Sequence, residues 1–146
     1  AMTERFVTKQ KFVGDTSRKA RVKVSYLGHN FQTWFLEKVE EPAAEVTLRY
    51  ARLSRGARDN EIRAELGTGF EETTLAQIYY LMEHQPNGED GVLLTDWWNV
   101  FYPRDIRGVL HAVSVDWGGD GWRVRAYSVD HLDGWGDGGR VFSRNS

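Results

Sequence analysis

The chain has no cysteine among its 146 residues. It therefore has no disulfide, no thiolate metal site, no iron–sulfur cluster and no cysteine nucleophile. Its apolar runs are only a few residues long, whereas a membrane-spanning helix needs about 20 in succession. The first residues also lack the apolar segment of a secretory signal peptide. Because a chain without cysteine fits a reducing compartment, we expect a cytoplasmic protein with no membrane partner.

An excess of charge of one sign is also missing, since 19 Lys and Arg face 21 Asp and Glu and leave a net charge of −2. This balance gives no overall attraction to nucleic acid. The sequence lacks His-x-His, His-Glu-x-x-His and Gly-x-Ser-x-Gly, and the glycines at 67–69 do not have the spacing of a phosphate loop. No enzyme class is indicated, so we expect no cofactor and lean towards a protein that is not an enzyme.

The length of the chain suits one domain with a substantial core. We expect a single domain over residues 1–146, with a basic β-hairpin at 1–28, a mainly helical part at 29–91 and an antiparallel meander with a glycine-rich tail at 92–146. The first 24 residues hold seven basic and two acidic side chains, and that hairpin is therefore a candidate nucleic-acid surface. The alternative is a solvated strand whose lysines protect the edge of a sheet.

The clearest strand pattern lies between residues 97 and 129. Val109, His111, Val113 and Val115 alternate with other side chains, so they would share one face of a strand. The glycine-rich segment 118–121 follows, and it is typical of a tight turn between antiparallel strands. The pattern predicts a three-stranded meander over about 97–103, 109–117 and 122–129.

Helical spacing appears earlier in the chain. Residues 29–41 and 74–85 carry apolar residues at helical intervals, with Asn30 as a predicted N-cap and a Thr74–Gln77 capping box. Residues 43–55 fit a strand or a helix, and we favour the strand. The sequence predicts an α+β fold: an antiparallel β-sheet with two or three helices packed on one face, and with the Phe31, Trp34 and Phe35 stripe in the core.

Tryptophans beside glycine-rich turns form the first candidate site. Trp117 and Trp122 flank the 118–121 turn, which contains Asp120, while Trp135 lies among glycines and aspartates and Trp97 is followed directly by a second tryptophan. Exposed tryptophans next to flexible loops are typical of ligand-stacking or partner-binding surfaces. The alternative is that these rings fill the core or pair across strands at the end of the sheet.

Two weaker candidates involve charged residues. Asp130, His131, Asp133 and Asp137 could wrap a hard cation, although Asp and Gly are also common in ordinary turns, so we expect no metal there. The second candidate is a row of arginines at every third position. Because a period of three keeps one face on neither a helix nor a strand, we favour ordinary surface arginines over a phosphate-binding stripe. The row consists of Arg49, Arg52, Arg55 and Arg58.

Several phrases of the sequence resemble a family of small uncharacterised proteins predicted in genomes of candidate-phylum bacteria. The resemblance covers about residues 29–145 and does not extend over the basic N-terminal segment. It implies a single bacterial domain and carries no activity, cofactor or site residue. The phrases are Asn30-Phe31-x-x-Trp34-Phe35-Leu36, Glu65-Leu66-Gly67, Leu93-Leu94-Thr95, Phe101-Tyr102-x-Arg104-Asp105-x-x-Gly108-Val109-Leu110, Gly121-Trp122-x-Val124-x-Ala126-Tyr127-Ser128-Val129 and Arg140-Val141-Phe142-Ser143-Arg144-Asn145.

The sequence does not decide the function. The first interpretation is a small non-catalytic binding domain that uses the aromatic–glycine loop end to hold an unknown protein or small molecule. The second is a metal-assisted hydrolase that uses the Asp130–Asp137 loop. The third is nucleic-acid binding through the basic N-terminal strands.

Overall fold

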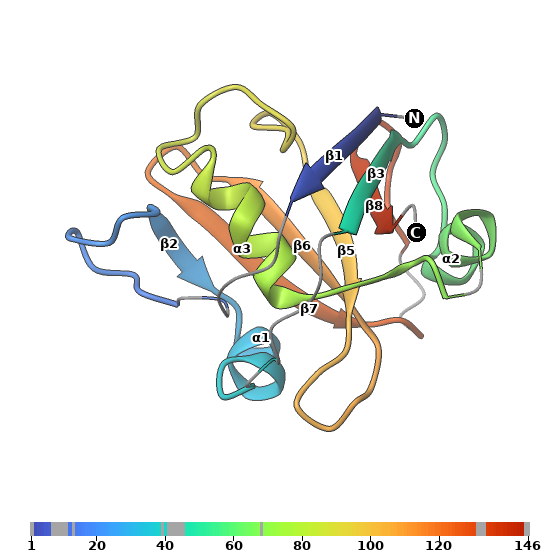
Figure 1. Cartoon of the computed structure of the whole chain (residues 1–146), viewed down its shortest axis with the longest axis horizontal. Coiled ribbons are helices and arrows are strands. Elements are labelled where there is room, and N and C mark those ends of the chain that lie inside the picture. Colours follow the sequence, from blue (N-terminus) through green and yellow to red (C-terminus); the bar gives the residue numbers. More distant parts are fainter. Residues whose placement is uncertain are drawn as a thin grey trace.

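A computed structural model describes residues 2–6, 12, 14–38, 40, 46–67, 69–130 and 134–144, with the backbone alone for 2–6 and 46. Seven strands form a sheet in the order β1-β3-β8-β5-β6-β7-β2, and a short β4 pairs with β5 beside it (Figure 1). The strands are β1 (Met2–Phe6), β2 (Val24–Leu27), β3 (Val46–Arg52), β4 (Glu72–Thr73), β5 (Asn99–Pro103), β6 (His111–Trp117), β7 (Trp122–Ser128) and β8 (Arg140–Arg144). The helices in these ranges are α1 (His29–Phe35), α2 (Asp59–Leu66) and α3 (Leu75–Glu83).

The α+β fold class is confirmed, but the prediction of an antiparallel sheet is wrong because the sheet is mixed. β5 pairs with β8 in parallel, and β2 pairs with β7 in parallel. The two described strands of the predicted N-terminal hairpin do not pair with each other, since β1 pairs with β3 and β2 lies at the opposite edge of the sheet, while residues 7–11 and 13 lie outside the described residues. Alternation along a strand identifies its buried face but not its neighbour or its direction.

Strands β5, β6 and β7 are joined by antiparallel pairs, with Val115 opposite Asn99 on one side and opposite Val124 on the other. In the turn between β6 and β7 the amide of Gly118 donates to the carbonyl of Gly121 (2.9 Å), and Gly119 has a φ of 91°. Glycine reaches this left-handed region without a clash, so the turn can be as tight as it is. The turn places Trp117 and Trp122 opposite each other at the end of the pair.

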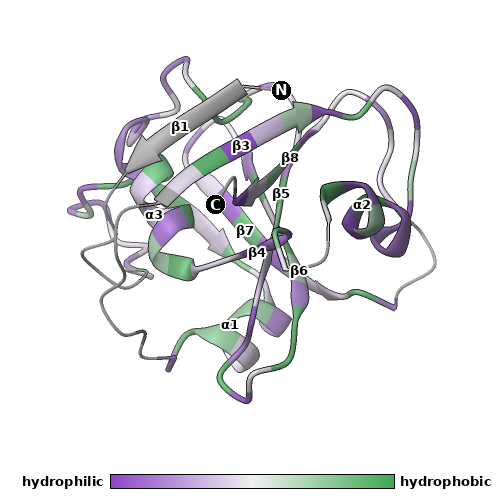
Figure 2. Cartoon of the chain, turned by 45° about the vertical axis from the view of Figure 1, so that its right-hand side comes forward, coloured by the Kyte–Doolittle hydropathy of each residue, from purple (hydrophilic) through white to green (hydrophobic). Residues whose placement is uncertain are grey.

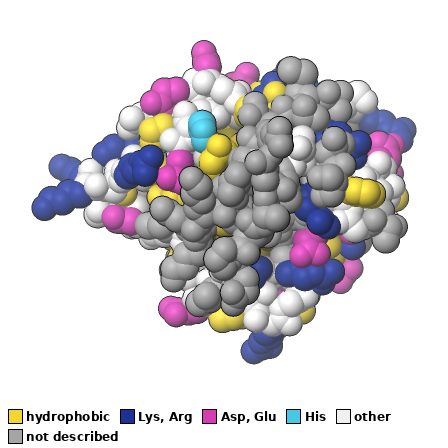
Figure 3. Space-filling model, viewed as in Figure 1, with side chains coloured by type: hydrophobic (Ala, Val, Ile, Leu, Met, Phe, Trp, Pro, Cys, Tyr) yellow, Lys and Arg dark blue, Asp and Glu magenta, His cyan; other side chains and the backbone are white. Residues whose placement is uncertain are grey.

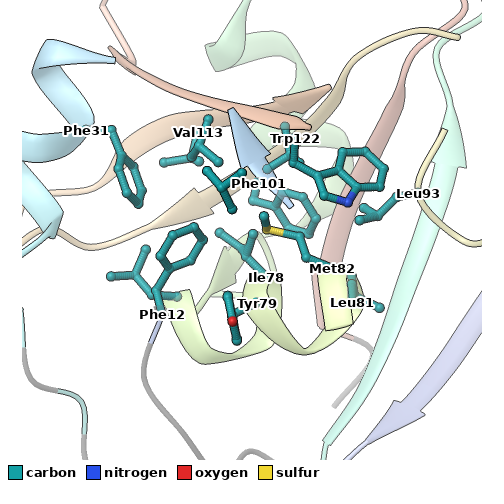
Figure 4. Close-up of a cluster of buried hydrophobic side chains, with 14 of the residues drawn as sticks. Phe12, Phe31, Ile78, Tyr79, Leu81, Met82, Leu93, Phe101, Val113 and Trp122 are labelled. Atoms are coloured by element: carbon teal, nitrogen blue, oxygen red, sulfur yellow. The ribbon is translucent and has the colours of Figure 1, made fainter. Parts of the chain in front are cut away.

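The main core lies between the sheet and the helices α1 and α3 (Figure 4). Ile78 and Met82 of α3 pack with Phe31 of α1 and with sheet residues such as Phe101 and Trp122, and all five are fully buried. In Figure 2 hydrophobic stretches (green) are visible on α1 and α3, the two helices that pack on this face. Large rings fill the space because each buries much apolar area at a small cost in conformational entropy.

A second core occupies the opposite face of the sheet, since successive residues of a strand point to opposite sides. Val100 and Tyr102 flank Phe101 in β5, and they pack with Ala112 and with Ile62 of α2. Two helices therefore cover one face, as the prediction of two or three helices on one face allows, while α2 covers the other face. Val109, which we expected in the core, is 50% exposed because it lies in the turn before β6.

The ends of the helices agree with some of the predicted caps and differ from others. Thr74 Oγ1 accepts a hydrogen bond from the Gln77 amide (3.1 Å) and Gln77 Oε1 accepts one from the Thr74 amide (2.9 Å), so the predicted capping box is confirmed. Asn30 is not the N-cap of α1, because that position belongs to Gly28 and the Asn30 side chain donates to the Ala126 carbonyl of β7 instead (3.2 Å). Helix α1 also ends at Phe35 rather than near residue 41. The favoured strand in 43–55 is confirmed as β3.

Candidate functional site

A cleft of about 260 Å³ opens between strand β3 and helix α2. Helix α2 lies beside β3 and β8, at the right of Figure 1. The chain leaves β3 after Arg52 and returns through residues 53–58 to begin α2, so one continuous segment forms the rim. The amides of Leu53 and Ala57 donate to the carbonyls of Gly139 and Trp135 (both 2.9 Å), and these bonds fix the rim against the last part of the chain.

The floor of the cleft is apolar. It consists of side chains from β3, the following loop, α2 and β8, most of which also belong to the second core: Ala51, Leu53, Ala57, Ile62, Leu66 and Val141. Ile62 and Val141 are buried, while the others are partly exposed where they face the opening. A partly open apolar floor is an unfavourable surface to leave in water, and it gains free energy when a ligand covers it.

Three of the four arginines in the row at every third position line this cleft: Arg49, Arg52 and Arg55. Arg49 donates from Nε to Ser143 Oγ and from Nη2 to the Leu66 carbonyl, both at 3.4 Å, which is long for a hydrogen bond. Arg52 donates from Nε to the Gly138 carbonyl (2.8 Å). The exposed Arg55 has no protein partner among the described residues.

None of these three arginines forms an ion pair with a carboxylate of the described residues. Some basic side chains elsewhere do pair, as Arg63 does with Glu71 (3.5 Å) and Arg104 with Glu72 (2.9 Å). Glu61 and Glu65 also line the cleft, but Glu61 Oε1 accepts the Arg58 backbone amide (3.0 Å) instead of binding an arginine. The cleft thus combines an apolar floor with guanidinium groups that described carboxylates do not neutralise.

Sequence reasoning missed this grouping because it treated the arginine row as one regular element. The row in fact spans the end of β3 and the irregular loop after it, so helix and strand periodicity do not apply beyond Arg52. The fourth member, Arg58, lies next to the cleft in a shallow hollow with Trp135, and the two spaces share Ala57 and Glu61. The sequence feature that could have indicated this site is the high density of arginines immediately before helix α2 and at its N-cap, Arg58.

The predicted aromatic surface is divided between the two faces of the sheet. Trp122 is fully buried in the main core and its Nε1 donates to the Gln85 carbonyl (2.8 Å), so it has no surface to offer a ligand. Trp117 is partly buried and packs edge-on against Trp122, with ring centroids 5.2 Å apart. Asp120 is exposed in the turn beside this pair, and Trp97 is 48% exposed.

Trp135 packs against the second core, whereas Trp117 and Trp122 belong to the main core on the other face of the sheet. Its Nε1 and the hydroxyl of Tyr102 both donate to Asp59 Oδ1, each over 2.7 Å. Burial, and then the neighbouring Asp59, raise the pKa of Tyr102, which keeps its hydroxyl protonated and able to donate. The fully buried Asp59 is the first residue of α2 and ties the helix to β5 and to the 134–136 segment.

A second buried pair joins Asp105 to His111. His111 Nε2 lies 2.7 Å from Asp105 Oδ2, and the ring of Trp34 stacks on His111 with centroids 4.0 Å apart. His111 is thus a buried residue held by a neighbouring carboxylate. Burial raises the pKa of Asp105, but hydrogen bonds from the Val109 amide, His111 and the Arg107 amide outweigh it, so the pKa lies below its usual value. The pair holds the loop between β5 and β6, which lies next to α1 in Figure 1.

The structure describes only part of the candidate metal and nucleic-acid sites. His131 and Asp133 lie outside the described residues, and within the described ranges no three His, Asp or Glu side chains are grouped to hold a metal ion. Lys9 and Lys11 also lie outside them, while Arg18 and Lys19 are exposed. Figure 3 shows basic side chains (dark blue) on the projection at its left. Among the helices that the structure describes, none has the length and apolar character needed to cross a bilayer.

Comparison with known proteins adds no relative. No family model, no curated protein and no solved structure matches this chain. The resemblance to small candidate-phylum proteins therefore stays a prediction, and the function has to be argued from the chain's own geometry.

Proposed function

We propose that the protein is a small non-catalytic binding domain whose ligand is a small molecule held in the cleft between β3 and α2. The observation that carries this proposal is the combination of a partly open apolar floor with three arginines that form no ion pair with a described carboxylate. Known ligand sites share this character, since they are concave and mostly apolar with a few polar groups that orient the ligand.

The proposal keeps the binding function that the sequence suggested but moves the site away from the aromatic–glycine end. A surface built on Trp117, Trp122 and Trp135 lacks support because Trp122 is fully buried and Trp135 donates to a buried carboxylate. Trp97 and Asp120 are exposed, but Asp120 lies at the β6–β7 turn and no interaction between the two side chains is present.

The test is a small-molecule screen by ligand-observed NMR, repeated on two variants that make the same chemical change. Ala51→Phe places a ring in the cleft, whereas Ala64→Phe places it on the exposed side of α2, outside the cleft lining. We expect ligands of the wild-type protein to lose binding in Ala51→Phe and to keep it in Ala64→Phe. Ligands that bind equally to both variants, or a diverse library without any ligand at millimolar concentration, would disprove the proposal.

A further inference from the structure

We propose that the ligand of this cleft is a compact organic monoanion in which a carboxylate is attached to an apolar body. This inference rests on the proposed function and assigns the ligand's chemical class. Three features of the cleft lead to it: the balance of charge on its lining, the free donors of its arginines, and the size and character of its floor.

The charge on the lining favours a single negative charge. Arg49, Arg52 and Arg55 face Glu61 and Glu65, which leaves one positive charge in excess. A polyanion such as a nucleoside triphosphate would bring several negative charges close to the two glutamates. Like charges at such short range are repulsive, so a ligand with one negative charge fits this lining best.

The arginines present donors that suit a carboxylate. A guanidinium group offers five N–H donors in a planar fork, and two of them match the two oxygens of one carboxylate. Arg52 uses only Nε in a hydrogen bond to the protein, and the two bonds of Arg49 are long enough to be exchanged for better ones. Arg55 is exposed at the same opening and can turn towards a ligand.

The floor and the volume define the rest of the ligand. Leu53, Leu66 and Val141 offer aliphatic contact and no polar group, so the part of the ligand below its carboxylate should be apolar. A volume of about 260 Å³ lies just below the roughly 300–1,000 Å³ that is usual for small-molecule sites. The cleft therefore fits a short aliphatic or single-ring acid better than a large cofactor.

The experiment compares ligands that differ only in their head group: hexanoate, hexan-1-ol, hexylamine and hexyl phosphate, with acetate as a head group without the body. Binding is measured by NMR titration of the labelled protein at constant ionic strength. We expect hexanoate to bind about tenfold more tightly than hexan-1-ol, because hydrogen bonds between charged groups are stronger than those of a neutral hydroxyl. Acetate should bind weakly, and hexylamine should be repelled by the arginines.

A charge-matched pair of variants locates the effect. Arg55→Ala removes a cleft arginine, while Arg107→Ala removes an exposed arginine in the β5–β6 loop, outside the cleft. We expect the preference for hexanoate over hexan-1-ol to fall several-fold in Arg55→Ala and to stay unchanged in Arg107→Ala. Because Arg55 is exposed, both variants should keep the wild-type midpoint of unfolding, which excludes misfolding as the cause.

The outcomes separate the ligand class from the proposed function. Equal binding of hexanoate and hexan-1-ol, tighter binding of hexylamine or hexyl phosphate, or an equal loss in both variants would overturn the assignment of a monoanion. If library ligands still bind and are lost in Ala51→Phe, the binding function survives and only the ligand class is wrong. If neither the panel nor the library binds, both proposals fail.

Discussion

Replacing Tyr102 with Phe tests the buried connection between the sheet and helix α2. The substitution keeps the ring, which is fully buried, and removes only the hydroxyl that donates to Asp59 Oδ1 over 2.7 Å. Asp59 is 0% exposed, so bulk water cannot replace the lost donor without entering the second core. The change therefore isolates one hydrogen bond to a buried carboxyl group.

The expected cost follows from the partner of that bond. Hydrogen bonds to charged groups contribute about 1.5–3 kcal/mol, which is more than the roughly 0.5–1.5 kcal/mol of a neutral pair. A domain of this size loses about 3–4 °C of melting temperature for each kcal/mol. We therefore expect Tyr102→Phe to lower the melting temperature by roughly 5–10 °C.

Thermal unfolding followed by circular dichroism measures this shift, urea denaturation gives the corresponding difference in free energy of unfolding, and Tyr26→Phe is the control. Tyr26 is 46% exposed, and its ring lies 5.2 Å from the Arg125 guanidinium carbon, a contact that Phe preserves. The control should stay within about 0.5 kcal/mol of wild type. A Tyr102→Phe variant as stable as this control, with an unchanged denaturant slope, would refute the idea that the Asp59 connection stabilises the fold.

Two further predictions concern pH and tryptophan accessibility. Because the pKa of Asp105 is lower in the folded chain than in the unfolded one, its carboxylate stabilises the fold above the unfolded pKa, and this contribution is lost as pH falls through the folded pKa. The urea midpoint should therefore fall less between about pH 5 and pH 2 in Asp105→Asn than in wild type. The exposed Asp137→Asn is the control. Parallel pH profiles in wild type and Asp105→Asn would contradict a lowered pKa of Asp105 in the folded chain. Acrylamide quenching of tryptophan fluorescence should decrease in Trp97→Phe, because this change removes a ring that is 48% exposed. It should not decrease in Trp122→Phe, because that change removes a fully buried ring. Reduced quenching in Trp122→Phe would contradict the burial of Trp122.

The sequence predicted those elements whose geometry depends on neighbours along the chain. The capping box of Thr74 and Gln77 needs only four consecutive residues, and helix α3 begins where the sequence placed it. Asn30 failed as a cap because its side chain binds the carbonyl of Ala126, 96 positions away. An N-cap preference is worth about 1 kcal/mol, so one bond to a distant strand is enough to override it.

Strand partners were harder to predict because they also depend on contacts between residues far apart in the sequence. β2 lies next to β7 although the two strands are about 100 residues apart in the sequence, and β8 is inserted between β3 and β5. Alternation of apolar residues indicates a strand, but every half-buried strand shares it, so it cannot choose among partners. The mixed sheet is thus a property of packing between distant segments, and it divides the tryptophans between the two faces.

The cleft between β3 and α2 was not predicted because its arginines come from a strand and from the loop that follows it. Arg49 belongs to β3, whereas Arg55 follows in the loop, and no single period describes both. Hydrogen bonds to backbone carbonyls hold Arg49 and Arg52, but no described carboxylate forms an ion pair with the three arginines of the cleft, and their like charges repel one another. Arg104, by contrast, pairs with Glu72 at 2.9 Å and contributes to the surface in the ordinary way.

Groups that oppose stability without a local compensation tend to mark functional sites, where the missing partner is a ligand. The cleft meets this description in two respects, since its three arginines form no ion pair with a described carboxylate and its apolar floor stays partly open. A carboxylate on an apolar body would satisfy both at once, with the head group at the arginines and the body on the floor. One ligand class thus accounts for two otherwise unfavourable features, which is why the cleft, rather than the tryptophans, is the best-supported site.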